Sequence, residues 1–285
     1  MSTEAAMGAI TGSTTAAMNG GTAGPDPDGP PSRRPGPTAQ LLRVQSREFV
    51  RERRGFVTSL LLPLGLATLF FGMAFVVPES GSGPGFSGMV VPLVIFLAVS
   101  TSPLMATAAS LADARARGTL RLLGTTPVGR ARLILTHVPA RLGLVLAQIV
   151  LLITVGIALG LAPAENAPAL FGVALLGVAL FGSIGYLLGG LSATAESAWN
   201  VSVFFQMVPF LLSGLVLPLN TLPAPLDSAL SWLPTSFFAD LLLGLMPHGG
   251  STHPVWLSVM VVAGTAVLVT ALAVRLFRWD QGEPR

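Results

Sequence analysis

Residues 142–161, LGLVLAQIVLLITVGIALGL, decide the fold class of this chain. Thirteen of these residues are Leu, Ile or Val, and none is charged. About 20 apolar residues are long enough to cross the ~30 Å hydrocarbon core of a bilayer as a helix. Each of the branched side chains favours membrane insertion by about 0.3–0.6 kcal/mol. The stretch therefore predicts a transmembrane helix.

Five further apolar stretches of similar length follow the same pattern. A backbone in lipid must satisfy its polar groups internally, so each stretch is expected to be α-helical. The spacings Gly156–Gly160 and Gly185–Gly189 would let helices approach closely. The sequence predicts an all-α membrane protein with a six-span domain over residues 57–280. The six predicted spans are 57–77, 87–110, 142–161, 168–191, 199–219 and 255–275.

The composition agrees with a surface that faces lipid. Of 285 residues, 52% are hydrophobic and only 10% charged, and the mean hydropathy is +0.72. A soluble domain carries about 25% charged residues. The absence of Cys excludes disulfides and thiolate chemistry, and the absence of Lys excludes a phosphate-binding P-loop.

The arginines predict the topology. All 16 basic residues are Arg, and they fall in three regions, 33–54, 115–141 and 275–285. By the positive-inside rule these regions are cytoplasmic. Both termini inside the cell require an even number of spans, which six satisfies. We therefore expect a multi-pass protein of the cell membrane with cytoplasmic N- and C-termini. Because topology explains the basic clusters, no nucleic-acid partner is expected.

Two segments precede the first span. Residues 1–38 are rich in Gly, Ala, Ser, Thr and Pro and predict a disordered cytoplasmic tail. Residues 39–56 predict an amphipathic interfacial helix, because Arg43, Arg47 and Arg51 share one face. Such a helix places its guanidinium groups at lipid headgroups. The alternative is a solvated charge cluster that only sets the topology.

An outer segment precedes the last span. Residues 220–254 hold several prolines around the apolar run Trp232–Met246. That run is too short to cross the membrane as a seventh helix. We expect a re-entrant or interfacial hairpin on the outer side.

Few residues could carry chemistry. The six spans contain no charged residue apart from Arg275, which closes the last span, and Glu196 lies just before the fifth span. A proton- or sodium-coupled transporter would be expected to bury a carboxylate within its spans. The lack of one in the predicted spans argues against this class of transporter. No HExxH motif and no pair of intramembrane aspartates occur, so we assign no catalytic residue. His248 and His253 could share a metal, but two histidines in a Gly-rich loop are usually bystanders, and we assign no metal site.

Asn200 and Gln206 are polar groups at membrane depth in the fifth span. Hydrogen bonds between helices are the first interpretation of these two residues. Contact with a transported substrate is the second.

Two motifs give a resemblance to a known family. The cytoplasmic loop holds Arg117-Gly118-Thr119-Leu120 and then Thr126-Pro127. Together with an outer Ser-Gly and proline pattern, this order resembles the type 2 ATP-binding-cassette (ABC) exporter permeases. The outer pattern is Ser213, Gly214, Pro218, Leu222, Pro223 and Pro234.

The chain departs from that family at two places. Ala114 and Ala116 stand where the family usually has acidic residues, with only Asp113 nearby. Leu241–Leu245 stands where the family often has an arginine.

The resemblance implies that transport and ATP hydrolysis are carried out by different subunits. Two permeases, as a homodimer or a heterodimer, would pair above separate ATPase subunits, so this chain would bind no cofactor and would use ATP through its partner. Residues 220–246 would close the outer end of the pathway, and spans two and five would line it, with Asn200, Phe205 and Gln206 as candidate lining residues. The implied ATPase-coupling residues are Asp113, Arg115, Arg117, Gly118, Thr119, Leu120, Thr126 and Pro127.

The function implied by the resemblance is export of a hydrophobic or amphiphilic compound, such as a drug or antibiotic, with the chain itself not an enzyme. One alternative is a membrane scaffold or lipid-interacting protein without transport activity. A secondary transporter is the other alternative, in third place.

Overall fold

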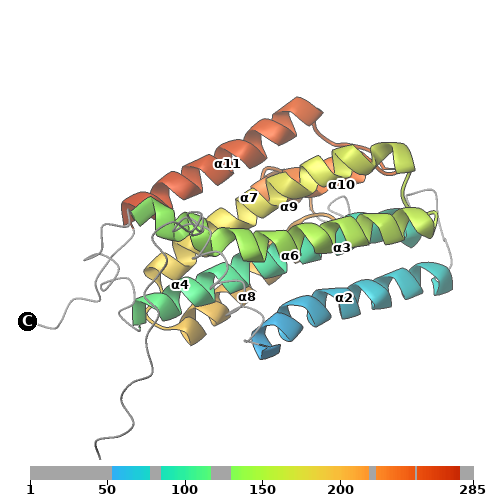
Figure 1. Cartoon of the computed structure of the whole chain (residues 1–285). Helices are drawn as coiled ribbons and strands as arrows, with labels where there is room; N and C mark the ends of the chain where they lie inside the picture. The colour runs from blue at the N-terminus through green and yellow to red at the C-terminus, as the bar shows by residue number, and fades with distance from the viewer. Residues whose placement is uncertain (1–52, 78–84, 117–129, 218–222, 248, 277–285) are drawn as a thin grey trace, which may run out of the picture. The chain divides into compact units, whose positions relative to one another are not determined.

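The computed structural model describes residues 53–77, 85–116, 130–217, 223–247 and 249–276, and all regular structure within them is helical (Figure 1). This confirms the all-α prediction for the described part of the chain. A π-helical segment, η1 (Ser102–Ala106), joins α3 to α4, and a 3-10 turn, η2 (Ala164–Asn166), precedes α7. The α-helices are α2 (Arg53–Val76), α3 (Phe86–Thr101), α4 (Thr107–Ala116), α6 (Arg130–Ala158), α7 (Ala167–Leu191), α8 (Ala195–Leu212), α9 (Ala224–Ser231), α10 (Pro234–Leu243) and α11 (Val255–Leu276).

Each predicted span lies largely within one helix or, for 87–110, within the continuous run of α3, η1 and α4. Among the residues described, three helical stretches are long and apolar enough to cross a membrane: Phe86–Asp113, Ala164–Leu191 and Val255–Leu276. Pro63–Val76, Leu142–Ala158 and Pro234–Leu243 are apolar but shorter. Multiple candidate spans identify a membrane protein, and the count of six stays a prediction.

The predicted segments before the first span fall mostly outside the described residues. The tail (1–38) and residues 39–52 of the interfacial helix are not among them. Residues 53–56 form the start of α2. The last residues predicted for the interfacial helix are therefore helical and continuous with the first predicted span.

Helix α3 holds the longest buried run in the described part of the chain. Every residue from Val90 to Thr101 is buried. Phe96 lies at the centre of an aromatic cluster, with ring centroids 5.5 Å from Phe181 on α7, 5.6 Å from Phe210 on α8 and 5.4 Å from Phe238 on α10. Tilted and edge-on aromatic pairs at this spacing stabilise packing beyond the apolar area that they bury. The cluster fixes four helices against one another.

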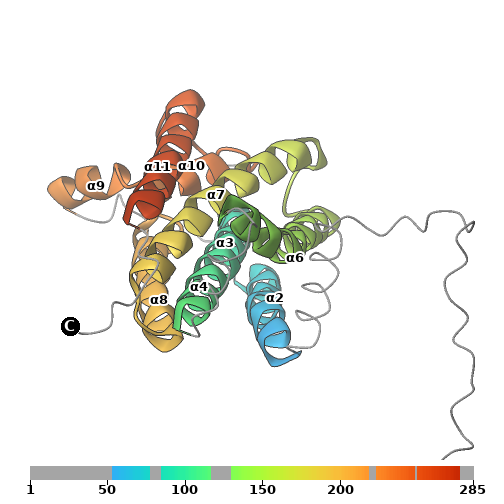
Figure 2. The ribbon, with the colours of Figure 1, turned by 60° about the vertical axis from the view of Figure 1, so that its left-hand side comes forward.

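Helix α7 packs closely on the run from α3 to α4, as Figure 2 shows. A Cβ atom at Gly185 would lie 2.7 Å from the carbonyl oxygen of Leu104, and one at Gly189 would lie 2.7 Å from that of Ala108. Only glycine permits this approach of two backbones. The predicted Gly185–Gly189 contact face is confirmed. Of the other pair, a Cβ at Gly156 would lie 2.9 Å from the side chain of Val91, whereas a Cβ at Gly160 would meet no atom within 4 Å. Gly160 has a positive φ of 72° after the end of α6.

The π-helical segment contains Pro103. Proline has no N–H to donate to the preceding turn, and such positions widen or kink a helix. The hydroxyls of Ser100 and Thr101, just before the segment, donate to the carbonyl oxygen of Leu97. The helical run from α3 to α4 therefore changes its hydrogen-bond pattern at Ser102–Ala106.

The outer face of α11 is apolar and exposed. Trp256, Met260, Val267, Leu268 and Val274 are between 64% and 72% exposed. Side chains of this kind are costly in water and fit the hydrocarbon of a bilayer.

The segment predicted to form a hairpin contains two short helices. α9 has no buried residue and stands apart from the other helices in Figure 2. α10 is buried from Thr235 to Leu242. A helical pair in this position agrees with the predicted hairpin, and its depth in the membrane stays a prediction.

Candidate functional site

Only two of the eight predicted ATPase-coupling residues belong to the described part of the chain, and both lie near the end of α4. Asp113 and Arg115 lie on α4. The other six lie outside the described residues: Arg117, Gly118, Thr119, Leu120, Thr126 and Pro127. The structure therefore gives the geometry of the place where the coupling loop leaves the helical bundle.

Arg115 caps the C-terminal end of α7. Its Nη1 atom donates to the carbonyl oxygens of Gly190 at 2.5 Å, Ser192 at 3.1 Å and Gly189 at 3.3 Å. The last four carbonyls of a helix have no partner within the helix and carry the negative end of its dipole. A guanidinium group satisfies both needs at once. Arg115 thereby ties the last turn of α4 to the end of α7.

The same corner contains the start of α8. Thr194 is the N-cap of α8, and its hydroxyl accepts a hydrogen bond from the backbone N–H of Ser197 at 3.1 Å. α4 packs against both α7 and α8. A displacement of α4 at this end would therefore move the α7–α8 connection with it.

The three candidate pathway residues on α8 lie on different faces. Gln206 is buried, and its Nε2 atom donates to Thr101 Oγ1 at 2.6 Å and Ser100 Oγ at 3.4 Å. Asn200 is exposed, and Phe205 is 43% exposed beside Phe204. The structure thus places Gln206 in a hydrogen bond between α8 and α3, whereas Asn200 and Phe205 are exposed.

Ser202, one turn before Gln206, is fully buried. Its hydroxyl has no hydrogen-bond partner among the described residues. Ser202 and Gln206, four residues apart on α8, are thus both buried, and of the two Gln206 bonds to Ser100 and Thr101 just before the π-helical segment.

The outer motif residues lie at helix ends. Ser213 follows α8 and donates from Oγ to Phe210 O at 2.8 Å, and Gly214 has a positive φ of 86° that favours glycine. Pro223 is the residue before α9, and Pro234 begins α10, a position where its missing N–H costs nothing. Pro218 lies outside the described residues. The described members of the motif set the turns at which helices start and stop.

The end of α8 is also joined to α10. Ser236 Oγ donates to Leu230 O at 2.8 Å and lies 3.4 Å from Leu212 O. This side chain links the connection after α8 to the paired helices α9 and α10.

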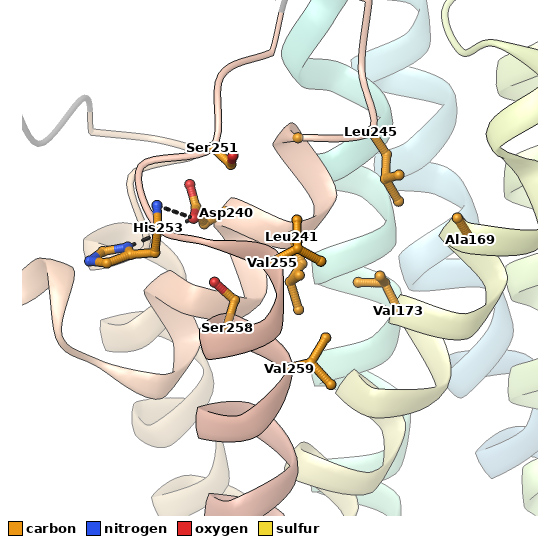
Figure 3. A pocket seen from close by; sticks show the side chains of 11 residues that line it. Ala169, Val173, Asp240, Leu241, Leu245, Ser251, His253, Val255, Ser258 and Val259 are labelled. Atoms are coloured by element: carbon orange, nitrogen blue, oxygen red, sulfur yellow. Dashed lines mark hydrogen bonds and ion pairs between the residues drawn. The ribbon is translucent and has the colours of Figure 1, made fainter.

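Sequence reasoning missed a buried carboxylate. Asp240 on α10 has a side chain only 8% exposed. It accepts a hydrogen bond from the backbone N–H of Thr252 at 2.6 Å. A second comes from the backbone N–H of His253 at 2.9 Å, as Figure 3 shows. The six predicted spans still contain no such group, but the outer segment does. The flanking run of apolar residues, Phe237, Phe238, Leu241 and Leu242, was the pattern that could have predicted its burial.

Asp240 adjoins a small cavity. The cavity is about 150 Å³ and lies between α7, α10 and α11 (Figure 3). His253, at its edge, has Nδ1 3.7 Å from Asp240 Oδ2 and its ring 4.4 Å from that of Phe237. Among the described residues, no three His, Cys, Asp or Glu side chains gather as a metal site. His248, the second histidine of the outer loop, lies outside the described residues.

The comparison with known families decides the identity. The sequence matches the profile of the ABC-2 family transporter proteins over residues 73–275, which is more than half of the chain. The chain belongs to the ABC-2 transporter family. The members of this family are membrane permeases that lack an ATPase domain, and an ATPase partner generally uses the ATP. The resemblance noted in the sequence is thereby confirmed.

Individual relatives are more distant. The chain is 27% identical over 198 residues to the probable multidrug ABC transporter permease YbhR of Escherichia coli strain K12, and equally to that of strain O157:H7. The alignment covers 68% of this chain and 53% of each relative. The chain thus spans about half the length of the curated relatives that it matches.

The ABC-2 match includes every candidate site of this permease. It contains the coupling residues, the candidate pathway residues of α8, the outer motif and Asp240. It leaves out residues 1–72, which hold the predicted tail, the predicted interfacial helix and most of α2.

Proposed function

We propose that this chain is the permease subunit of an ATP-driven exporter and carries a hydrophobic or amphiphilic compound, such as a drug or antibiotic, out of the cell. The observation that supports this most is the contact between Arg115 and the end of α7. It lies directly before the loop that would receive force from an ATPase subunit. There it adds polar hydrogen bonds to the packing of α4 against α7.

The contacts beyond Arg115 extend the coupling into the bundle. Gly189 and Gly185 hold α7 against α4 and η1 at backbone distance, and Gln206 joins α8 to the end of α3. Packed elements transmit displacement because their interiors have little free volume. A push on α4 therefore reaches α7 and α8 together.

The proposal includes the partners and the orientation. Residues 111–131 would contact a separate ATPase subunit below the membrane, and two permease chains, identical or related, would face each other. Both termini would lie in the cytoplasm of the cell, as the arginine clusters predict. The name of the distant relative YbhR supports a drug-like cargo. The chemistry of α8 agrees, because its exposed side chains Phe204, Phe205 and Met207 suit an apolar compound.

Asp240 does not support the alternative of ion-coupled transport. A carboxylate that exchanges a proton or sodium ion during transport needs ligands that change. Both oxygens of Asp240 accept backbone N–H groups of the same loop. This arrangement suits an anchor for residues 252–253.

The test is isolation of the permease from its host membrane, with residues 118–126 either intact or replaced by a Gly-Ser sequence of equal length. We expect an ABC ATPase subunit to co-purify with the intact chain and to be lost from the variant. Efflux of an amphiphilic dye from cells should fall with it. A matched control replaces the nine residues 277–285, also predicted to be cytoplasmic, by Gly and Ser, and should leave the ATPase bound.

Two results would contradict the proposal. If the 118–126 variant retains both the ATPase and efflux, the coupling assignment is wrong. If no ABC ATPase accompanies the intact permease and efflux is absent, the chain is better described as a membrane scaffold.

A further inference from the structure

The cavity beside Asp240 has two chemically different ends. Val173 on α7 and Leu241 and Val259 from α10 and α11 form apolar walls (Figure 3). Asp240, Ser251 and His253 lie together at the other end. A volume of about 150 Å³ matches a cavity that can hold one benzene-sized group. The shape and lining suit a small amphiphile with one polar head.

The polar end contains an unused hydrogen-bonding atom. Nδ1 of His253 is buried and has no hydrogen-bond partner among the described residues. It lies 3.7 Å from Oδ2 of Asp240, which is too long for a direct hydrogen bond. A buried polar atom without a partner is costly and calls for an explanation. A donor group placed between these two atoms would supply the missing bonds.

The charged groups at the polar end of the cavity favour a cationic hydrogen-bond donor. Asp240 is acidic, and among the described residues His253 is the only basic side chain that lines the cavity. Each carboxylate oxygen of Asp240 accepts one backbone N–H and can accept a second donor. The described lining therefore contains one carboxyl group and no Lys or Arg. An anion would be repelled, whereas an ammonium group would be attracted and could donate to both Asp240 Oδ2 and the Nδ1 of the histidine.

We propose that this cavity is a binding site for a small amphiphilic ammonium compound, whose apolar body lies against Val173, Leu241 and Val259 and whose ammonium group bridges Asp240 and His253. The site lies between α7, α10 and α11, apart from α8 and the coupling corner. It goes beyond the proposed export function, since binding here requires neither an ATPase partner nor transport.

The test uses the purified full-length chain in a non-ionic detergent and isothermal titration calorimetry. The probe is benzylamine, which is cationic at neutral pH, and benzyl alcohol is the neutral compound of the same shape. We expect saturable binding of benzylamine at one site. Benzyl alcohol should bind at least tenfold more weakly, because hydrogen bonds to charged groups are worth roughly tenfold or more in affinity.

Three variants separate the site from partition into the detergent. Val173→Phe fills the apolar end and should lower the affinity for benzylamine by at least about tenfold. Leu175→Phe is its matched control, because this side chain is exposed on the same helix and does not line the cavity. His253→Phe keeps the backbone N–H that Asp240 accepts and removes both ring nitrogens, Nδ1 among them, so the affinity should fall roughly fivefold.

Each alternative outcome would overturn the proposal. Equal binding of benzylamine and benzyl alcohol would mean that no ammonium site exists. Loss of affinity that is the same for Val173→Phe and Leu175→Phe would place the probe elsewhere. The absence of saturable binding by the folded chain would mean that the cavity holds only water.

Discussion

Nη1 of Arg115 lies 2.5 Å from the carbonyl oxygen of Gly190, a residue 75 positions later in the chain. This hydrogen bond closes the corner where α4 ends, α7 ends and α8 begins. It joins a residue of the predicted coupling segment to the helix that contacts most of the bundle.

Substitution of Arg115 should weaken this corner. We expect Arg115→Ala to lower the free energy of unfolding by about 1–3 kcal/mol, because the carbonyls of Gly189 and Gly190 lose a charged donor. Arg115→Lys keeps the charge but has a single ammonium group in place of the planar fork, so it should restore only part of the loss. Thermal unfolding in detergent measures both. Wild-type stability of Arg115→Ala would show that the cap contributes nothing.

The two interpretations of the polar residues in α8 give opposite expectations for stability. Gln206→Leu removes the bonds to Thr101 and Ser100 and should cost about 0.6–1.7 kcal/mol, the range for hydrogen bonds between membrane helices. Ser202→Ala removes a buried hydroxyl without a partner and should be neutral or stabilising. Asn200→Ala, on the exposed face, should leave unfolding unchanged and act only on dye efflux. If Asn200→Ala destabilises more than Gln206→Leu, these assignments are reversed.

Glycine at position 185 is required by the close approach of α7 to η1. Gly185→Ala places a Cβ 2.7 Å from a backbone oxygen, so the helices must separate, and overpacking of this kind costs about 1–3 kcal/mol. The matched substitution Gly172→Ala, on the same helix, meets no atom within 4 Å and should be tolerated. Comparison of the two unfolding temperatures checks the prediction, and equal temperatures would contradict it.

Asp240 should stabilise the loop before α11. Asp240→Asn keeps one carbonyl oxygen, so one of the N–H groups of Thr252 and His253 loses its acceptor, and we expect a loss of about 1–3 kcal/mol. Asp227→Asn, on α9, is the control and should have little effect, since α9 has no buried residue. Proteolysis within residues 249–254 should also become faster in Asp240→Asn alone.

The absence of cysteine from the natural chain allows a direct test of topology. Ala116→Cys and Ser251→Cys each introduce one thiol at an exposed position. We expect a membrane-impermeant maleimide to label Ser251→Cys on intact cells and Ala116→Cys only after the cells are opened. Labelling of both from outside would overturn the predicted orientation.

The helices were predictable from the sequence because an apolar run of about 20 residues has the length that a helix needs to cross the hydrocarbon core of a membrane. The paired glycines at positions 185 and 189 were predictable for the same local reason, since their spacing places both on one face of a helix. Glycine spacing alone could not give the partner, and the structure shows it to be the backbone of η1 and α4.

Contacts between distant segments were not predictable. Arg115 was predicted only as part of a basic cytoplasmic segment. The residues around it do not indicate that its side chain caps a helix that ends 76 residues later. Asp240 lay in a segment interpreted as an outer hairpin, and its burial depends on the loop at residues 252–253 folding back over it. A proline such as Pro103 is typical of a disturbed helix, but it does not specify the π-helical form that the run takes there.

The most direct measurement is ATP-dependent uptake of an amphiphilic fluorescent dye by inside-out vesicles that hold this permease and its ABC ATPase subunit. We predict uptake that starts on addition of ATP, stops without it, and is lost when residues 118–126 are replaced. Uptake that persists without ATP and follows the proton gradient would contradict the proposed function.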